Sequence, residues 1–184
     1  GETNVRLADA VVINKVVEAA FEDIQEVRDN VKEINPEAVI IDGASPLTIT
    51  GDLESLEGMK VLVVEDGPTL THGEMTYGAG VVAAMRMGAA ELVDPRPWAQ
   101  GKLQDTFDAY PEIGTLLPAM GYGDEQKSDL EKTINKVDCD AVVIGTPIDL
   151  TRVIKIKKPT VRVGYELQEV GKPDLAQVLA RFLD

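Results

Sequence analysis

Short runs of branched aliphatic residues alternate with segments of helical pattern along this 184-residue chain. The aliphatic runs lie at residues 8–15, 38–42, 60–64, 91–93, 141–144 and 160–165. The helical patterns lie at residues 18–34, 79–87, 101–110, 124–136 and 173–183. Strands that alternate with helices form right-handed parallel crossovers. The sequence therefore predicts an α/β fold, in which a mostly parallel sheet with flanking helices forms a Rossmann-like three-layer structure.

A linker at residues 53–58 marks the predicted domain boundary. Residues 1–52 contain two expected strands and one expected helix, which is too little for an independent domain. We therefore expect residues 1–52 to be the C-terminal end of a nucleotide-binding domain whose start is not in this chain. Residues 53–184 contain enough elements for a compact C-terminal α/β domain, which we expect on the substrate side.

Composition excludes several classes of protein. The formal net charge of −14 argues against nucleic-acid binding, which needs a basic surface. No apolar run reaches 18 residues, and the first residues lack the pattern of a signal peptide. The single cysteine, Cys139, suits a reducing compartment. We expect a cytoplasmic protein that binds neither nucleic acids nor membranes.

The stretch after the expected strand at 60–64 is dense in polar side chains between glycines. His72, the only histidine, is a candidate general acid or base. Glu65 and Asp66 are candidate catalytic carboxylates that also suit Mg²⁺, with Asp66 as the metal ligand. Thr69 and Thr71 are candidate hydrogen-bond donors to phosphate oxygens. The alternative is a long structural connection built from turn-forming residues.

Three further groups follow other expected strands. Arg96 lies between two prolines after the strand at 91–93, and its guanidinium suits a phosphate or carboxylate. Gly145 and Thr146 follow the strand at 141–144, and Arg152 comes soon after. Each group alone is compatible with a turn. In a parallel sheet the carboxyl ends share one edge, so together these residues favour a binding site there.

Asn14 and Lys15 end the first expected strand, and Ser45 follows the second. In GTPases an Asn-Lys pair in this position contacts the guanine base, with an acid two residues after the lysine. Val17 occupies that position here, so ATP and GTP both stay open. A nucleotide-base pocket is predicted from these strand ends. No Gly-rich phosphate-binding loop is present, so the chain lacks the usual device for a triphosphate.

Eight segments together carry a resemblance to a known family. They are GETNVRLAD, VVINK, ASP, VLVVEDGPTLTHGEMTYGAG, ELVDPRP, LPAMGYG, VVIGTPIDL and KPTVRVGYEL. With these segments the chain resembles the cyclic 2,3-diphosphoglycerate synthetases, which are P-loop NTPases often described as GTP-binding proteins. The resemblance implies that residues 1–52 end a P-loop domain. It also implies that the loop containing Gly73, the DPRP segment and the GTPID segment face the acid substrate.

The activity implied by the resemblance is an ATP-driven, Mg²⁺-dependent closure of an intramolecular phosphoanhydride. The expected cofactors are ATP or GTP and Mg²⁺, and the expected partner is a phosphorylated small acid such as 2,3-diphosphoglycerate. The chain alone is predicted to be inactive because it lacks the phosphate-binding loop. The alternative is a GTP-binding or metabolite-binding module without catalysis, for which a homodimer is a possible assembly.

Overall fold

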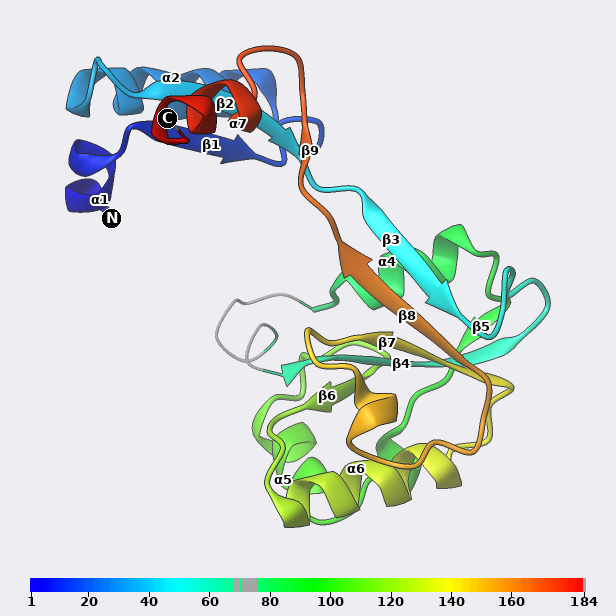
Figure 1. Cartoon of the computed structure of the whole chain (residues 1–184). Helices are drawn as coiled ribbons and strands as arrows, with labels where there is room; N and C mark the ends of the chain where they lie inside the picture. The colour runs from blue at the N-terminus through cyan, green and yellow to red at the C-terminus, as the bar shows by residue number, and fades with distance from the viewer. Residues whose placement is uncertain (68–69, 71–75, 184) are drawn as a thin grey trace. The chain divides into compact units, whose positions relative to one another are not determined.

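The computed structural model describes residues 1–67, 70 and 76–183, which form two compact units (Figure 1). Unit 1 contains Gly1–Pro46 and Tyr165–Asp184, and unit 2 contains Leu47–Gly164. The sequence placed the boundary between residues 52 and 53 and assigned everything after it to the second domain. In the structure the C-terminal segment from Tyr165 instead packs with the N-terminal segment.

Unit 2 is built on a six-stranded sheet in the order β3-β8-β7-β4-β5, with β6 also paired to β4. The strands are β3 (Leu47–Gly51), β4 (Lys60–Asp66), β5 (Glu91–Leu92), β6 (Leu117–Ala119), β7 (Ala141–Gly145) and β8 (Thr160–Tyr165). The helices are α4 (Ala79–Arg86), α5 (Lys102–Ala109) and α6 (Asp124–Lys136), with short 3₁₀ turns η1 (Arg96–Trp98) and η2 (Leu150–Arg152).

The central strands of this sheet run parallel. β4 pairs in parallel with β5, β6 and β7, and β7 pairs in parallel with β8. β3 lies at the edge beside β8 and runs in the opposite direction (Figure 1). The prediction of an α/β fold with a central sheet flanked by helices is confirmed.

β4 is the centre of the core. Its residues from Val61 to Glu65 are buried without interruption, which is the pattern of a parallel strand covered on both faces. Figure 1 shows α4 on one side of the sheet and α5 and α6 on the other. The small residues Ala79, Gly80, Ala83 and Ala84 of α4 are buried, so this helix approaches the sheet closely. That approach brings the first turn of α4 to the end of β4.

Unit 1 is a smaller α/β assembly. Its three-stranded sheet has the order β1-β2-β9, with β1 parallel to β2 and β9 antiparallel to it. Its elements are α1 (Glu2–Leu7), β1 (Ala10–Asn14), α2 (Phe21–Ile34), β2 (Val39–Ala44), β9 (Gln168–Glu169), α7 (Leu175–Leu179) and the 3₁₀ turn η3 (Ala180–Phe182). The structure shows no feature of residues 1–52 that marks them as the end of a P-loop domain.

Two local predictions differ from the structure. The segment Leu47–Gly51 was expected in a loop and forms the edge strand β3. The helix expected from residue 18 begins at Phe21, because Glu18 and Ala19 form a turn on the carbonyl of Lys15. Within the described part of the chain, no helix is long and apolar enough to cross a bilayer.

Candidate functional site

The carboxyl ends of β4, β6 and β7 meet at one edge of the sheet in unit 2. Glu65 of β4 lies in register between Pro118 of β6 and Gly145 of β7, and Asp66 is paired with Ala119. This parallel arrangement confirms that Glu65 and Gly145 share an edge, as expected from the alternation of strands and helices. In α/β proteins this edge is the usual place for a ligand.

Glu65 is the buried carboxyl group of this edge. Glu65 is only 3% exposed. Its Oε1 accepts a hydrogen bond of 3.0 Å from the N–H of Val81. Val81 lies in the first turn of α4, where N–H groups have no partner within the helix. The carboxylate of Glu65 therefore satisfies the N-terminal turn of α4 and holds it at the end of β4.

Three glycines leave the space that this carboxyl group fills. A Cβ atom would lie 2.7 Å from Glu65 Oε2 at Gly78, 3.1 Å from Oε1 at Gly80 and 2.5 Å from Oε2 at Gly145. None of these distances allows an ordinary contact between side chains. Gly145 also faces the backbone nitrogen of Gly80, which would lie 2.9 Å from an added Cβ. The buried carboxyl group therefore favours glycine most strongly at Gly78 and Gly145, whereas at Gly80 an added Cβ would meet Val63 Cγ1 first, at 2.9 Å.

Burial raises the pKa of Glu65 from 4.5 to about 7. Loss of hydration is the largest cause, because it disfavours the charged form. Hydrogen bonds from the N–H groups of Val81, Gly80 and Gly78 lower the pKa, and the neighbouring charge of Asp66 raises it slightly. Burial outweighs the hydrogen bonds, so Glu65 changes its charge near neutral pH.

Asp66, Thr146 and Tyr122 complete the described part of this edge. Thr146 is buried, and its hydroxyl donates a hydrogen bond of 2.6 Å to the carbonyl of Ile148. The Tyr122 hydroxyl oxygen is buried and makes no hydrogen bond of regular geometry with the described residues, while an interaction with the Thr146 hydroxyl lowers its pKa. Burial, followed by the charge of Asp66, raises the pKa of Tyr122 overall. This edge thus combines a carboxylate with a buried hydroxyl that has unused hydrogen-bonding capacity.

The two predicted arginines lie in different surroundings. Arg96 donates from Nη1 to Asp94 Oδ1 at 3.0 Å and from Nη2 to the carbonyl of Ile113, and it lies 4.7 Å from the ring centroid of Phe107. β5 ends at Leu92, opposite Val61 of β4. The DPRP segment therefore follows a strand that stops four residues short of the level of Glu65. Through these contacts Arg96 packs against α5.

Arg152 ends the 3₁₀ turn η2, which follows the loop after β7. Its charge lowers the pKa of Asp149, although the hydrogen bond from Thr151 is the main cause of that shift. Arg152 is exposed. Arg152 lies on the chain segment that follows Thr146.

In unit 1, Asn14, Lys15 and Ser45 lie at the carboxyl ends of β1 and β2. Asn14 is in register with Gly43, and the N–H of Lys15 donates to Asn14 Oδ1 at 2.9 Å. Lys15 has a φ of 65° and places Nζ 5.8 Å from the ring centroid of Tyr165. The structure thus brings the three predicted base-binding residues to one edge, and their role in binding a base stays a prediction.

Four predicted site residues lie outside the described residues: Thr69, Thr71, His72 and Gly73. Among the residues that the structure describes, no group of three or more His, Cys, Asp or Glu side chains could hold a metal ion. Mg²⁺ often uses only one or two carboxylates with water, so this observation leaves Asp66 as a predicted ligand.

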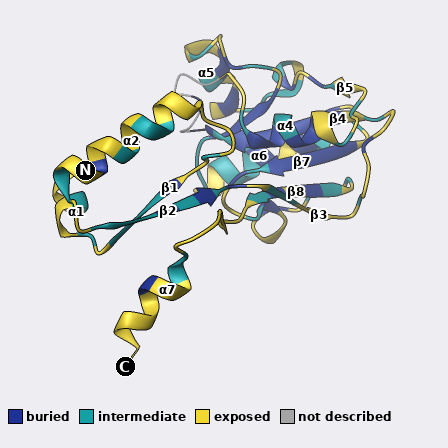
Figure 2. Ribbon diagram, turned by 90° about the horizontal axis from the view of Figure 1, so that it is seen from above, coloured by how far each residue is buried: buried dark blue, intermediate teal, exposed yellow. Residues whose placement is uncertain are grey.

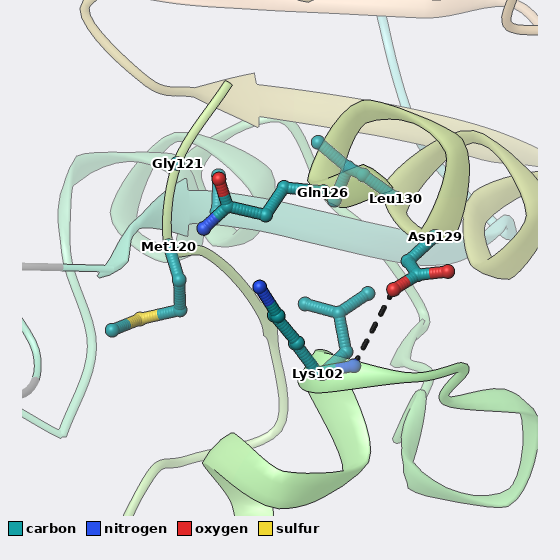
Figure 3. A pocket seen from close by; sticks show the side chains of 8 residues that line it. Lys102, Met120, Gly121, Gln126, Asp129 and Leu130 are labelled. Atoms are coloured by element: carbon teal, nitrogen blue, oxygen red, sulfur yellow. Dashed lines mark hydrogen bonds between the residues drawn. The ribbon is translucent and has the colours of Figure 1, made fainter. Parts of the chain in front are cut away.

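A small cavity lies beside β6, between α5 and α6 (Figure 3). Its volume is about 20 Å³, which is enough for about one water molecule. Lys102 donates its backbone N–H to Asp129 Oδ2 at 3.4 Å across one end of it. The cavity is too small for a substrate, and the edge at β4, β6 and β7 remains the better candidate.

No family model matches the sequence. A curated protein from Thermococcus kodakarensis, arginine synthetase ArcE, is 53% identical over 179 residues. The match covers 97% of this chain and 40% of the Thermococcus protein. The chain therefore spans less than half the length of the curated relative that it matches.

This relative corrects the resemblance inferred from the eight sequence segments. The assignment to the cyclic 2,3-diphosphoglycerate synthetases is wrong, because the protein that matches nearly the whole chain is named an arginine synthetase. The same finding overturns ATP-driven phosphoanhydride closure and the alternative of a GTP-binding module. Motifs at strand ends indicate a binding edge of a parallel sheet. They do not by themselves indicate which substrate binds there.

Sequence reasoning missed Tyr122, and it missed that the glycines at this edge pack against the Glu65 carboxyl group, although Gly145 was itself a candidate site residue. Tyr122 lies in a Gly-Tyr-Gly segment two residues after a three-residue strand that the sequence did not indicate. The signal for the glycines was present, because two of them open a helix directly after the polar stretch. Their contacts with Glu65 depend on how closely α4 approaches β4.

Proposed function

We propose that this chain is part of an enzyme that forms arginine and that the edge of β4, β6 and β7 binds the cationic end of the amino acid. The 53% identity with arginine synthetase ArcE carries the proposal. Because the chain spans 40% of that protein, the remaining length of such an enzyme contributes to the complete reaction.

The charge of the chain supports a cationic ligand. Its formal net charge is −14, which repels phosphates and attracts cations over distances comparable with the Debye length. The guanidinium group of arginine keeps its positive charge at every pH at which proteins are stable. An acidic surface is therefore better suited to arginine than to the phosphorylated acid expected from the sequence.

The chemistry of the edge supports the same ligand. A guanidinium group offers five N–H donors and no acceptor, so its site must provide oxygen atoms. Asp66 provides a carboxylate, and the Tyr122 hydroxyl provides a buried oxygen that makes no hydrogen bond of regular geometry with the described residues. Hydrogen bonds between a guanidinium and a carboxylate are charge-assisted and strong. In this proposal Asp66 and Tyr122 contact the ligand.

Glu65 has a different role in this proposal. Its carboxyl group is buried and bonded to the first turn of α4, so it acts as a positioning residue. It holds the turn that contains Gly78 and Gly80 against the end of β4. Its proton is retained up to a pH of about 7, which limits the negative charge placed beside Asp66.

Removing either contact is expected to weaken the binding of arginine. Asp66→Asn removes a charge-assisted hydrogen bond, typically about 1.5–3 kcal/mol, and should raise the Kd at least about tenfold. Tyr122→Phe should weaken binding less, and it should change the stability of the ligand-free chain little, because the hydroxyl makes no hydrogen bond of regular geometry with the described residues. NMR titration with arginine measures both Kd values, and thermal unfolding measures stability.

Asp138→Asn is the matched control for Asp66→Asn. Asp138 is exposed and precedes β7 at the opposite end of the strand from Gly145. Asp138→Asn removes the same formal charge as Asp66→Asn. A loss of affinity seen in both variants therefore comes from the change in the overall charge of the chain. Equal affinities for both variants, or arginine-dependent shifts that leave out Asp66, Tyr122 and Thr146, would contradict the proposed place of binding.

A further inference from the structure

Unit 1 leaves many of its large apolar side chains uncovered. Among the residues that the structure describes, fifteen large hydrophobic side chains are exposed, and ten of them belong to unit 1, the smaller unit. Phe21 is 70% exposed and Phe182 is 59% exposed. Figure 2 shows α1, α2 and α7 mostly in the colour of exposed residues. The ten residues are Leu7, Val17, Phe21, Val27, Tyr165, Leu167, Val170, Leu179, Phe182 and Leu183.

The sheet of unit 1 is also open. β1 stands at the edge of the order β1-β2-β9. β1 and β2 pair in parallel, and parallel strands are normally covered on both faces. Ile13 is the only buried residue of β1, and Val31 is the only buried residue of α2. An open edge of this kind offers a row of unpaired backbone groups to a further strand.

We infer that β1 and the apolar side chains of unit 1 dock against an α/β segment that adds a parallel strand beside β1. This segment corresponds to the part of the Thermococcus protein that the chain does not span, which is about three fifths of its length. The inference rests on the exposed side chains, the open sheet edge and the sequence relationship, and it holds whether or not arginine is the product.

A second copy of this chain fits the surface less well. A two-fold axis between two copies would pair β1 with β1 in opposite directions, which does not continue the parallel ladder of β1 and β2. Two chains with a charge of −14 each also repel one another. A partner segment with its own sequence avoids both difficulties.

The test uses a chimera in which this chain replaces the matching part of the Thermococcus protein. Hydrogen exchange is measured at residues 10–14 in the chimera and in the separate chain. We expect exchange at β1 to be at least about a hundredfold slower in the chimera. Exchange at the edge strand β3, in unit 2, should be the same in both and serves as the internal control.

Variants test the side chains directly. The pair Phe21→Asp and Phe182→Asp should lower the Tm of the chimera and leave the Tm of the separate chain unchanged. Met85→Asp, at a residue that is 61% exposed in unit 2, is the matched control and should change neither. Equal exchange at β1 in both proteins would overturn the inference. Concentration-dependent protection of β1 in the separate chain, or a chimera that does not fold although both parents do, would also overturn it.

Arginine formation is assayed separately from the protection of β1. Protection of β1 without arginine formation would leave the docking inference standing and would count against the proposed function. Arginine formation with an unprotected β1 would support the proposed function and would count against the docking inference. The two proposals therefore fail separately.

Discussion

Between pH 4.5 and pH 8, the titration of Glu65 is expected to lower the free energy of unfolding by about 3 kcal/mol. The pKa of Glu65 is about 7 in the folded chain and 4.5 when unperturbed. Between these values the folded state binds a proton that the unfolded state has lost, so stability falls as the pH rises. The contribution is complete below pH 4.5 and lost above pH 7. The expected loss follows from the difference between the two pKa values, since a tenfold change in a proton-binding constant is worth about 1.4 kcal/mol.

Glu65→Gln isolates this effect, because glutamine imitates the protonated acid in shape and charge. The variant should match the parent near pH 5 and exceed its stability at pH 8. Urea unfolding followed by the fluorescence of Trp98 reports on unit 2, because Trp98 is the only tryptophan and packs against its core. Glu112→Gln, at an exposed position, is the control. Parallel pH profiles for the parent and Glu65→Gln would show that Glu65 does not carry the dependence.

Gly145→Ala is expected to destabilise unit 2 by about 2–3 kcal/mol. The new methyl group would lie 2.5 Å from Glu65 Oε2 and 2.9 Å from the backbone nitrogen of Gly80. Movement of a side chain cannot relieve the contact with the backbone nitrogen of Gly80, so α4 has to move away from β7. Overpacking of a tight interior typically costs about 1–3 kcal/mol, and here it also weakens the hydrogen bond between Glu65 and Val81. Urea unfolding measures the change.

Gly164→Ala is the control for this substitution. Gly164 lies in β8, and its added Cβ would meet only the Thr48 hydroxyl, at 3.0 Å. A hydroxyl can rotate away, so a much smaller loss is expected there. The double variant Glu65→Ala with Gly145→Ala should lose less than the sum of the single variants, because the two residues share one contact. Additive losses would show that the destabilisation by Gly145→Ala does not come from its contact with Glu65.

The alternation of strands and helices was sufficient to predict the parallel sheet. α6 has the predicted bounds because its apolar residues are evenly spaced and Gln126 accepts a hydrogen bond from the N–H of Gly123 at its start. β3 was not predicted, because its flanking glycine and proline are typical of loops. Its β-branched residues Thr48, Ile49 and Thr50 form a strand only because β8 is available beside them.

The candidate site was predicted less completely than the fold. Glu65, Asp66, Gly145 and Thr146 were expected at one edge, and the structure places them there. The position of the first turn of α4 could not be read from the sequence, and that turn determines the pKa and hydrogen bonding of Glu65. The ligand could not be read either, because an edge of carboxylates and hydroxyls accepts several chemistries. The proposed ligand is a cation instead of an anion because the relative from Thermococcus is named an arginine synthetase.

Arginine formation by the chimera of this chain with the remaining part of the Thermococcus protein tests the central claim most directly. With the intact Thermococcus protein as the positive control, we expect the chimera to form arginine, and Asp66→Asn to reduce the rate at least about tenfold while Asp138→Asn retains it. A folded chimera that forms no arginine under conditions in which the Thermococcus protein does would contradict the assignment of this chain to an arginine-forming enzyme.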